Sequence, residues 1–375
     1  MKISQEQRNR CAERLKAAAE RVPSLSAFIG LDGFVDEILH VVDKRFSATE
    51  YTRLETISAF AQRLAAAAGR STNVELVRKM QKLGGNGPIM GNALAALGLQ
   101  VTYVGNLGWP DPHPVFREFC ERAEVHTIAP PGLTDAYEFT DGKIMVGKHE
   151  SLREVTWENV CARWSREGFE EKFRTASLVG FVNWTMLPYM SDIWEALQTE
   201  LCPKLDGPRR RLFIDLADPE KRTNEDIRRA LDLVVKFGQW FDVILGLNEK
   251  EAFEVGKALE LELPDHSPEG VQSLARAIAE RVPVQTLVVH PVAYALAISN
   301  GELAITPGPV TDDPLITTGA GDHFNSGFCL GKLLGFDDLD ALLTAVTTSG
   351  FYVRTARSPN VLELAATLAD ANIKY

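Results

Sequence analysis

The 375-residue sequence contains few cysteines, and the five present are scattered along it as Cys11, Cys120, Cys161, Cys202 and Cys329. No two of them form a C-x-x-C pair. A disulfide framework needs paired cysteines and a structural zinc site needs closely spaced ligands, so the sequence predicts neither. Reduced thiols of this kind are typical of the cytosol, and we expect a cytoplasmic protein.

The sequence also lacks an excess of positive charge and a long hydrophobic run. Its formal net charge is −11, from 40 Lys and Arg against 51 Asp and Glu. Nucleic-acid binding needs basic side chains to neutralise phosphates, so we expect no nucleic-acid partner. No stretch approaches the roughly 18 apolar residues of a membrane span, and we expect no membrane partner. Residues 1–21 carry charges throughout, which indicates an amphipathic helix and not a secretion signal.

Short β-rich runs alternate with helical patterns along most of the chain. This alternation predicts an α/β fold with a doubly wound, mainly parallel sheet flanked by helices, in which ligands bind beyond the carboxyl ends of the strands. The predicted strands are Ala27–Leu31, Val101–Gly105, Leu178–Val182, Leu212–Leu216, Val243–Leu247, Thr286–His290, Tyr294–Ile298 and Leu303–Thr306. The predicted helices are Gly91–Leu97, Val115–Ala123, Ser191–Glu200, Asn224–Lys236, Lys250–Ala258, Pro268–Arg281, Asp322–Leu334 and Asp338–Thr355.

Two segments interrupt this alternation. Residues 43–76 are polar and predict a largely helical excursion, and Val77–Lys82 continues as a charged helical pattern. Residues 134–149 instead alternate apolar and polar positions on both sides of Asp141-Gly142, which predicts a β-hairpin. A hairpin beside the first strands could cover a binding site as a lid.

A glycine loop at Gly319-Ala320-Gly321 leads directly into a helical pattern at Asp322. Glycines leave backbone N–H groups bare at a helix N-terminus, where the helix dipole also favours an anion. A carboxylate beside a bound anion suggests a general base that takes a proton from a hydroxyl attacking a phosphoryl group. The alternative is an ordinary glycine turn, with Asp322 favoured by the dipole.

A second glycine-rich loop contains Gly84, Gly85, Asn86 and Gly87, with Asn92 further along. The glycines allow a ligand to touch backbone, and the two asparagine amides suit hydroxyl groups. The alternative is a loop that enters a buried helix. Two carboxylates near the end of the first strand, Asp32 and Asp36, could bind sugar hydroxyls, although Asp32-Gly33 is also typical of a turn.

Asn248 and Glu251 follow the strand Val243–Leu247. Asn at a helix N-cap with Glu three residues later is the pattern of a capping box, which is a purely structural role. The functional alternative places both side chains near Mg²⁺ and phosphate groups.

Several of these motifs together resemble the ribokinase-like (PfkB) carbohydrate kinases, over about residues 25 to 355. The resemblance implies residues 1–24 as a helical extension and residues 25–375 as the kinase domain, with lid excursions at about 40–76 and 131–150. It also implies transfer of the ATP γ-phosphate to a sugar hydroxyl with Mg²⁺. The motifs, in chain order, are Asp36, Gly84-Gly85 with Asn92, Gly105-Asn-Leu-Gly108 with Asp111, Asn248-x-x-Glu251 and Gly319-Ala-Gly-Asp322.

The resemblance also assigns roles to residues. Asp322 would be the general base, and the backbone of Gly319, Ala320 and Gly321 the anion hole. Asp36, Gly84, Gly85 and Asn92 would hold the sugar, together with the nearby polar residues Asp32 and Asn86. Asn248 and Glu251 would organise Mg²⁺ and the phosphates, Glu251 through water, with Thr317, Thr318 and Asp215 also on the nucleotide side.

Two departures from the family pattern leave alternatives open. Ile316 stands where the signature usually has Asp, a residue that helps build a monovalent-cation site in some members, so K⁺ activation is not predicted. Val289–Ala295 replaces the usual nucleotide-loop pattern Thr-x-Gly-x-x-Gly. A non-catalytic sugar or nucleotide sensor and a nucleoside kinase therefore remain as alternatives. Lids of this family can pair between subunits, which makes a homodimer a further expectation.

Overall fold

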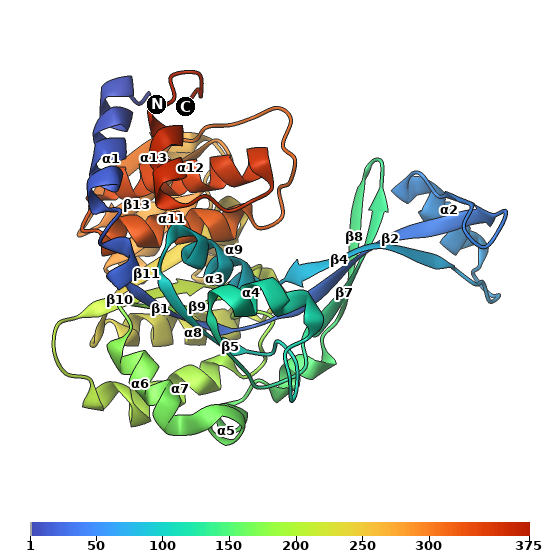
Figure 1. Cartoon of the computed structure of the whole chain (residues 1–375), viewed down its shortest axis with the longest axis horizontal. Coiled ribbons are helices and arrows are strands. Elements are labelled where there is room, and N and C mark those ends of the chain that lie inside the picture. The colour runs from blue at the N-terminus through green and yellow to red at the C-terminus, as the bar shows by residue number, and fades with distance from the viewer. Residues whose placement is uncertain (1) are drawn as a thin grey trace.

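A nine-stranded sheet forms the centre of the protein in the computed structural model, which describes residues 2–375 (Figure 1). The strand order is β14-β13-β12-β11-β10-β9-β1-β5-β6. The strands from β12 to β6 in this order run parallel, while β13 and β14 form an antiparallel edge. Their bounds are β1 Ser26–Leu31, β5 Gln100–Gly105, β6 Glu124–Thr127, β9 Leu178–Phe181, β10 Arg210–Asp215, β11 Phe241–Asn248, β12 Thr286–His290, β13 Tyr294–Ser299 and β14 Glu302–Pro307.

Helices cover both faces of this sheet, and each face has its own hydrophobic core. This arrangement confirms the predicted doubly wound α/β fold, and each predicted strand is present within two residues of its expected ends. On one face lie α1 Gln5–Ala18, α3 Asn86–Leu97, α4 Arg117–Arg122, α11 Ala320–Leu333, α12 Asp338–Thr355 and α13 Val361–Ala369. On the other lie α5 Trp157–Val160, α6 Arg166–Thr175, α7 Met190–Glu200, α8 Asn224–Phe237, α9 Glu249–Ala258 and α10 Pro268–Arg281.

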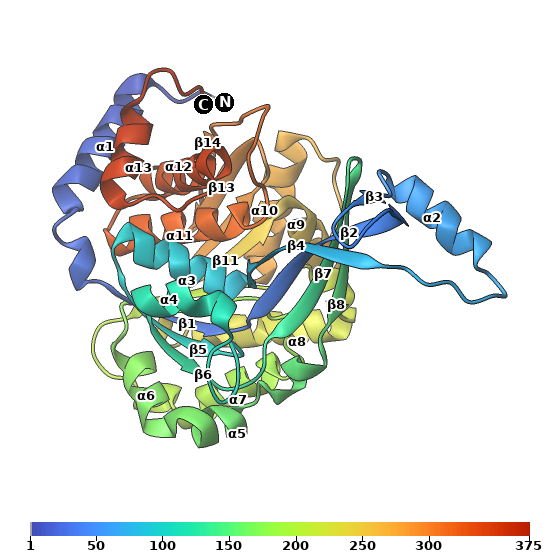
Figure 2. The same ribbon diagram turned by 45° about the vertical axis from the view of Figure 1, so that its right-hand side comes forward.

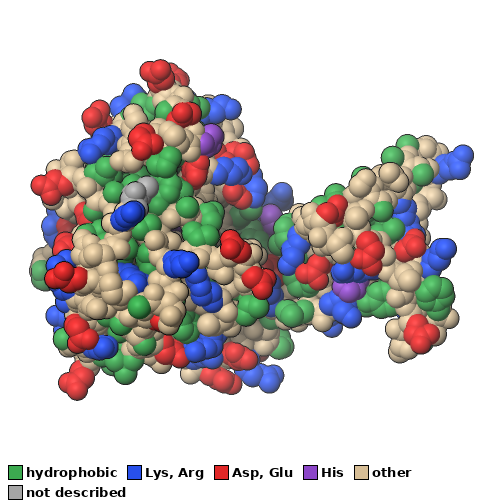
Figure 3. Space-filling model, turned by 90° about the horizontal axis from the view of Figure 1, so that it is seen from above, with side chains coloured by type: hydrophobic (Ala, Val, Ile, Leu, Met, Phe, Trp, Pro, Cys, Tyr) green, Lys and Arg blue, Asp and Glu red, His purple; other side chains and the backbone are tan. Residues whose placement is uncertain are grey.

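A second, smaller sheet projects from the body as a lid, with helix α2 Ile57–Ala66 at its outer end (Figures 1 and 2). Seen from above, this lid is an arm that stands out from the main body (Figure 3). Its own small core joins α2 to the strands through Phe60, Val41 and Phe139. The lid strands are β2 Phe34–Arg45, β3 Tyr51–Arg53, β4 Leu76–Gly84, β7 Gly132–Phe139 and β8 Gly142–Lys148.

The predicted hairpin at residues 134–149 is confirmed as the antiparallel pair β7 and β8. The helical prediction for residues 43–76 is wrong for most of the segment, where only α2 is helical, and the helical prediction for Val77–Lys82 is wrong because these residues lie in β4. The central residues of β4, from Arg78 to Gln81, are exposed. A strand that water reaches on both faces has no apolar alternation, so its charges do not reveal a period of two.

The N-terminal helix α1 packs against α13 and α12, so the two ends of the chain lie side by side (Figures 1 and 2). A capping box at Ser4 starts this helix, and the Arg14 guanidinium pairs with the buried Asp340 carboxylate of α12. No helix within residues 2–375 combines the length and the apolar character needed to cross a membrane.

Helix α11, which carries the candidate base, lies unusually close to α12. A Cβ atom at Gly331 would be 2.7 Å from Ala341 Cα, and one at Gly327 would be 2.8 Å from Ala345 Cα. Both neighbours are atoms of the α12 backbone, which cannot move aside as a flexible side chain can. The two glycines therefore fix the position of α11 against the neighbouring helix.

We predict that Gly331→Ala lowers the free energy of unfolding by about 1–3 kcal/mol, because the added methyl group overpacks the α11–α12 contact. Gly308→Ala is the matched control, since its new Cβ would lie 3.6 Å from its nearest neighbour, at an ordinary contact distance. Denaturant unfolding of both variants measures the difference. Equal stability of Gly331→Ala and the wild type would show that the contact is not tight.

Candidate active site

Four buried carboxylates gather where the central strands end. Asp32 follows β1 and is 0% exposed, and Asp215 is the last residue of β10. Glu251 lies in the first turn of α9, just after β11, and Asp322 in the first turn of α11. The chain thus places acidic side chains at the carboxyl edge of a parallel sheet, where ligands of such folds bind.

Three of these carboxylates each accept a hydrogen bond from a different asparagine amide. Asn183 Nδ2 lies 2.8 Å from Asp32 Oδ2, and Asn325 Nδ2 lies 2.8 Å from Asp215 Oδ2. Asn86 Nδ2 lies 3.0 Å from Asp322 Oδ1. A neutral amide satisfies part of a carboxylate's hydrogen-bonding capacity without cancelling its charge.

Burial raises the pKa of all four carboxylates, and charge repulsion adds to this effect in Asp215, Glu251 and Asp322. Burial raises the pKa of Asp32 and of Asp215 to about 6, although the asparagine hydrogen bonds act in the opposite direction. The pKa of Glu251 rises to about 8, mainly through burial and then through the charge of Asp215. The pKa of Asp322 is raised well above its usual range, first by burial and then by Asp215, while Asn86 lowers it. A carboxylate with a raised pKa can accept a proton near neutral pH.

The glycine loop before Asp322 forms the N-terminus of α11, which begins at Ala320, two residues earlier than predicted. Gly319 is the N-cap with φ +91°, a left-handed conformation that suits glycine. The Ala320 N–H donates to the Thr317 carbonyl at 3.1 Å. The loop therefore has the backbone geometry of an anion-binding helix N-terminus beside a carboxylate.

The second glycine loop is held by Asp32. Its carboxylate accepts from the backbone N–H groups of Asn86 at 3.0 Å and of Gly87 at 2.8 Å, in addition to the Asn183 amide. These three bonds occupy most of its acceptor capacity, so Asp32 positions the loop at the start of α3. The same loop reaches Asp322 through the Asn86 side chain.

Asp36 lies on the lid strand β2 and faces the glycine loop. A Cβ atom at Gly84 would be 2.6 Å from the Asp36 carboxyl carbon and oxygens, so a side chain there would displace this carboxylate. Burial raises the pKa of Asp36, and the neighbouring Lys82 lowers it. The structure thus brings together Asp36, Gly84, Gly85 and Asn86, from the lid and the body, on the side of Asp322.

Asn92 does not join this group. It lies further along α3, and its Oδ1 accepts from Arg122 Nη1 at 3.0 Å. Together with Thr318 it lines a cavity of about 580 Å³ on the other side of the 316–321 loop. The family resemblance assigned Asn92 to the sugar. In the structure, the rotation of the helix between positions 86 and 92 turns the Asn92 side chain away from Asn86 and toward Arg122.

A separate cavity of about 380 Å³ lies on the opposite side of the glycine loop. Thr317, Ala320 and Gly321 form its floor near Asn248, and its other walls are largely apolar. The His290 ring stacks on Phe324 with 4.5 Å between ring centroids, and burial lowers the pKa of His290 to about 4, so the ring is neutral. A largely apolar cavity next to an anion-binding loop can accept the planar base of a nucleotide whose phosphates lie at the loop.

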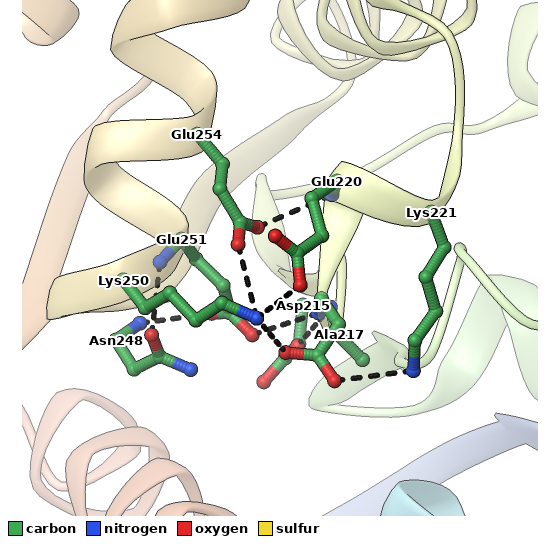
Figure 4. A network of polar contacts seen from close by, with 9 residues as sticks. Asp215, Ala217, Glu220, Lys221, Asn248, Lys250, Glu251 and Glu254 are labelled. Atoms are coloured by element: carbon green, nitrogen blue, oxygen red, sulfur yellow. Dashed lines mark hydrogen bonds and ion pairs between the residues drawn. The ribbon is translucent and has the colours of Figure 1, made fainter.

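Asn248 and Glu251 form the capping box that the sequence offered as the structural alternative (Figure 4). Asn248 Oδ1 accepts from the Glu251 N–H at 2.9 Å, and Glu251 Oε2 accepts from the Asn248 N–H at 2.8 Å. The other Glu251 oxygen, Oε1, accepts from the Asp218 N–H at 3.1 Å. The cap uses one oxygen of the carboxylate and the Asp218 N–H the other, so a metal ion would reach Glu251 only through water or through the remaining lone pairs.

The same network gathers more acidic side chains near Asp215 (Figure 4). Lys250 pairs with Asp218, Glu220 and Glu254. Within residues 2–375, no three His, Cys, Asp or Glu side chains converge closely enough to ligate a metal ion on their own. Mg²⁺ is usually held by one or two carboxylates with water and substrate phosphates, so this arrangement suits an ion that arrives with a nucleotide.

Two of these asparagines, Asn183 and Asn325, were missed in the sequence analysis. Asn183 directly follows the predicted strand Leu178–Val182 and has φ +61°, and Asn325 lies three residues after Asp322, on the same side of α11. Both positions could have been found from the strand end and the helical spacing. His323, the residue after the candidate base, is also buried, at 2% exposure.

The family described as prokaryotic ketohexokinase matches residues 3–371. The chain belongs to this family. A ketohexokinase from Haloferax volcanii is 30% identical over 358 residues, which cover 95% of this chain and 93% of the relative. The protein is thus a ribokinase-like carbohydrate kinase, a phosphotransferase with an alcohol group as acceptor, and the family implies use of ATP.

Solved structures show the same fold. An Arabidopsis thaliana ribokinase complexed with ribose and ATP matches with a TM-score of 0.65 at 16% identity, over 92% of this chain and 99% of that chain. A nucleoside kinase from Methanocaldococcus jannaschii matches with a TM-score of 0.57 at 12% identity, over 92% and 97%. The family membership favours the sugar-kinase hypothesis over both alternatives, the sensor and the nucleoside kinase.

We predict that Asn86→Ala moves the acidic limb of the pH profile of kcat/KM to higher pH. The Asn86 hydrogen bond lowers the pKa of Asp322, so its loss raises that pKa and makes the base less available in mildly acidic solution. Asn92→Ala is the matched control, because Asn92 bonds to Arg122. An unchanged acidic limb in Asn86→Ala would show that Asp322 is not the titrating base.

Proposed function

We propose that the protein transfers the γ-phosphate of ATP to a hydroxyl group of a ketohexose, with Asp322 as the general base. The observation that carries this proposal is the position of the Asp322 carboxylate. It lies in the first turn of α11 and accepts a hydrogen bond from Asn86 of the other glycine loop. A hydroxyl held by that loop would face both the base and the anion-binding turn. The ketohexose is suggested by the name of the Haloferax relative.

The chemistry follows from this placement. Asp322 accepts the proton of the attacking hydroxyl as the new oxygen–phosphorus bond forms, while the bond from the γ-phosphorus to the bridging oxygen breaks and ADP leaves. Its raised pKa makes Asp322 a stronger base than an ordinary aspartate. The backbone N–H groups of residues 319–321 and the α11 dipole stabilise the charge on the transferring phosphoryl group. Since phosphoryl transfer needs little covalent participation by the protein, alignment and electrostatics supply most of the rate.

The residues on the nucleotide side suit Mg²⁺ and ATP. Asp215 and Glu251 offer only oxygen donors, which are the ligands that Mg²⁺ prefers. Glu251 would act through water, because backbone N–H groups of Asn248 and Asp218 already occupy both of its oxygens. Bound Mg²⁺ would neutralise phosphate charge. The base of ATP would lie in the cavity beside Thr317 and Phe324. The proposal includes no monovalent cation, because position 316 is isoleucine.

On the sugar side we assign Asp36, Gly84, Gly85 and Asn86 to the sugar. Asp36 and Gly84 belong to the lid strands β2 and β4, and Gly85 and Asn86 to the body, so closure of the lid would complete the sugar site. Asp32 would act by holding the loop. Thr318 and Asn92 would not touch the sugar directly, since both line the cavity beyond the 316–321 loop.

We also propose that residues 25–375 act as one kinase domain with residues 1–24 as a helical extension, in the cytoplasm, and that two copies pair through their lids. Met80, Ile38, Ala136 and Met145 lie opposite one another across four lid strands. The two methionines at the ends of this row are 56% and 54% exposed. Apolar side chains left open on a sheet favour association. A monomeric mass in light scattering would contradict the pairing.

We predict that ADP release coupled to a ketohexose exceeds that with aldohexoses, ribose and nucleosides, and that Asp322→Asn lowers kcat about 10²- to 10⁴-fold with little change in sugar affinity. The amide keeps the shape of the side chain but cannot take the proton. Asp192→Asn, an exposed aspartate paired with Arg229, is the matched control and should keep wild-type turnover.

Turnover by Asp322→Asn at the wild-type rate would contradict the role of the base. Activity with nucleosides alone would contradict the acceptor class.

A further inference from the structure

A buried histidine, His323, directly follows Asp322 and has no role in the chemistry described above. His323 follows Asp322 in α11, and its ring lies on the opposite side of the loop from the ATP cavity, in the wall of the 580 Å³ cavity. At 2% exposure it is one of the least accessible polar side chains of the site. Burying an imidazole costs free energy unless its ring nitrogens find partners.

Both ring nitrogens have such partners. Nδ1 lies 2.7 Å from the Gly319 carbonyl oxygen, and Nε2 lies 2.8 Å from Ser358 Oγ. A carbonyl oxygen can only accept, so Nδ1 carries the proton and donates it. Burial lowers the pKa of His323 to about 4, so the neutral ring has only this one N–H, and Nε2 accepts from the Ser358 hydroxyl.

Tyr352 of α12 completes the arrangement. Its ring stacks on His323 with 3.6 Å between centroids and 13° between planes. Its hydroxyl donates to the Thr318 carbonyl at 3.0 Å. The stacked pair therefore holds two consecutive carbonyl groups of the loop, at Thr318 and Gly319.

Holding these carbonyls also fixes the N–H groups on the other side of the loop. A peptide unit is planar and trans, so its C=O and N–H point in opposite directions. The Thr318 carbonyl sets the direction of the Gly319 N–H, which is one of the amides assigned to the anion hole. The Gly319 carbonyl sets that of the Ala320 N–H, which donates to the Thr317 carbonyl and so closes the turn that carries these amides. The Gly319 carbonyl also accepts from the His323 backbone N–H at 3.1 Å, and the side chain adds a second bond at a glycine, the residue with the greatest backbone freedom.

We propose that His323, assisted by Tyr352, is a positioning residue that orients the anion-hole amides toward the transferring phosphoryl group. The inference rests on the proposed function of the 319–321 backbone. It assigns to His323 a contribution to kcat through backbone geometry, with no contact to substrate and no proton transfer.

Three substitutions of His323 separate this role from simple packing. In His323→Asn the amide nitrogen takes the approximate place of Nδ1 and can still donate to Gly319. In His323→Gln the amide lies near the place of Nε2 and reaches Ser358 instead, while His323→Ala makes neither bond. We expect kcat to fall about 10- to 100-fold in His323→Ala and His323→Gln, and to stay within about threefold of wild type in His323→Asn. KM for the sugar should change less than threefold in all three.

A stability control accompanies these variants. Ile278→Ala removes a fully buried side chain of α10, on the other face of the sheet, and should lower the unfolding temperature while keeping kcat. All assays are run at a temperature where circular dichroism shows each variant folded. Tyr352→Phe, which keeps the stack and loses only the hydroxyl, should lower kcat by a smaller factor than His323→Ala.

Wild-type kcat in His323→Ala, or equal loss in the Asn and Gln variants, would overturn the positioning role. Loss of kcat in Ile278→Ala to the same extent would overturn it too, because the effect would then follow stability alone. Failure of the proposed function is recognised separately, as a wild-type protein without ATP-dependent turnover or a fully active Asp322→Asn variant.

Discussion

The burial of several carboxylates at one edge of a parallel sheet is the constraint on which the rest of the structure depends. Asp32, Asp215, Glu251 and Asp322 are all removed from water, and burial raises the pKa of each. Asparagine amides and backbone N–H groups donate hydrogen bonds to these carboxylates. The neighbouring Lys250 forms its ion pairs with acidic residues outside the cluster, such as Asp218. The raised pKa values suit the proposed proton-accepting base, and the clustered oxygen donors would suit Mg²⁺.

The architecture supplies this cluster from distant parts of the sequence. Strand ends deliver Asp32 and Asp215, and the N-terminal turns of two helices deliver Glu251 and Asp322. Helix α11 lies close to α12 because Gly327 and Gly331 have no side chains, and α12 in turn carries Tyr352 to the back of the catalytic turn. The contact between α11 and α12 therefore contributes both to the packing of the core and to the geometry of the glycine turn before Asp322.

Much of this could be predicted from the sequence because the signals were local. The buried strands produced clear apolar runs, and the glycine turn identified Asp322 and its helix. The lid strand β4 could not be recognised, since its charged, exposed side chains have no apolar alternation. The roles of Asp32 and His323 depend on partners about 55 and 35 residues away, Gly87 and Ser358, which only the folded chain brings together. The contact of Asn92 with Arg122 could not be foreseen either, because loop position alone does not fix a side-chain direction.

The most direct measurement is the free energy of unfolding of wild type and Asp322→Asn, without ligands, between pH 5 and 8. The folded-state pKa of Asp322 is raised above its unfolded value, so its contribution to stability is full below the unfolded pKa and is lost as pH rises through the folded pKa. The asparagine side chain of the variant cannot ionise and avoids this loss. We predict that Asp322→Asn becomes increasingly more stable than wild type as pH rises. A difference that is independent of pH, or a wild type that is more stable at pH 8, would contradict a buried Asp322 carboxylate whose pKa is raised by burial and by neighbouring acids.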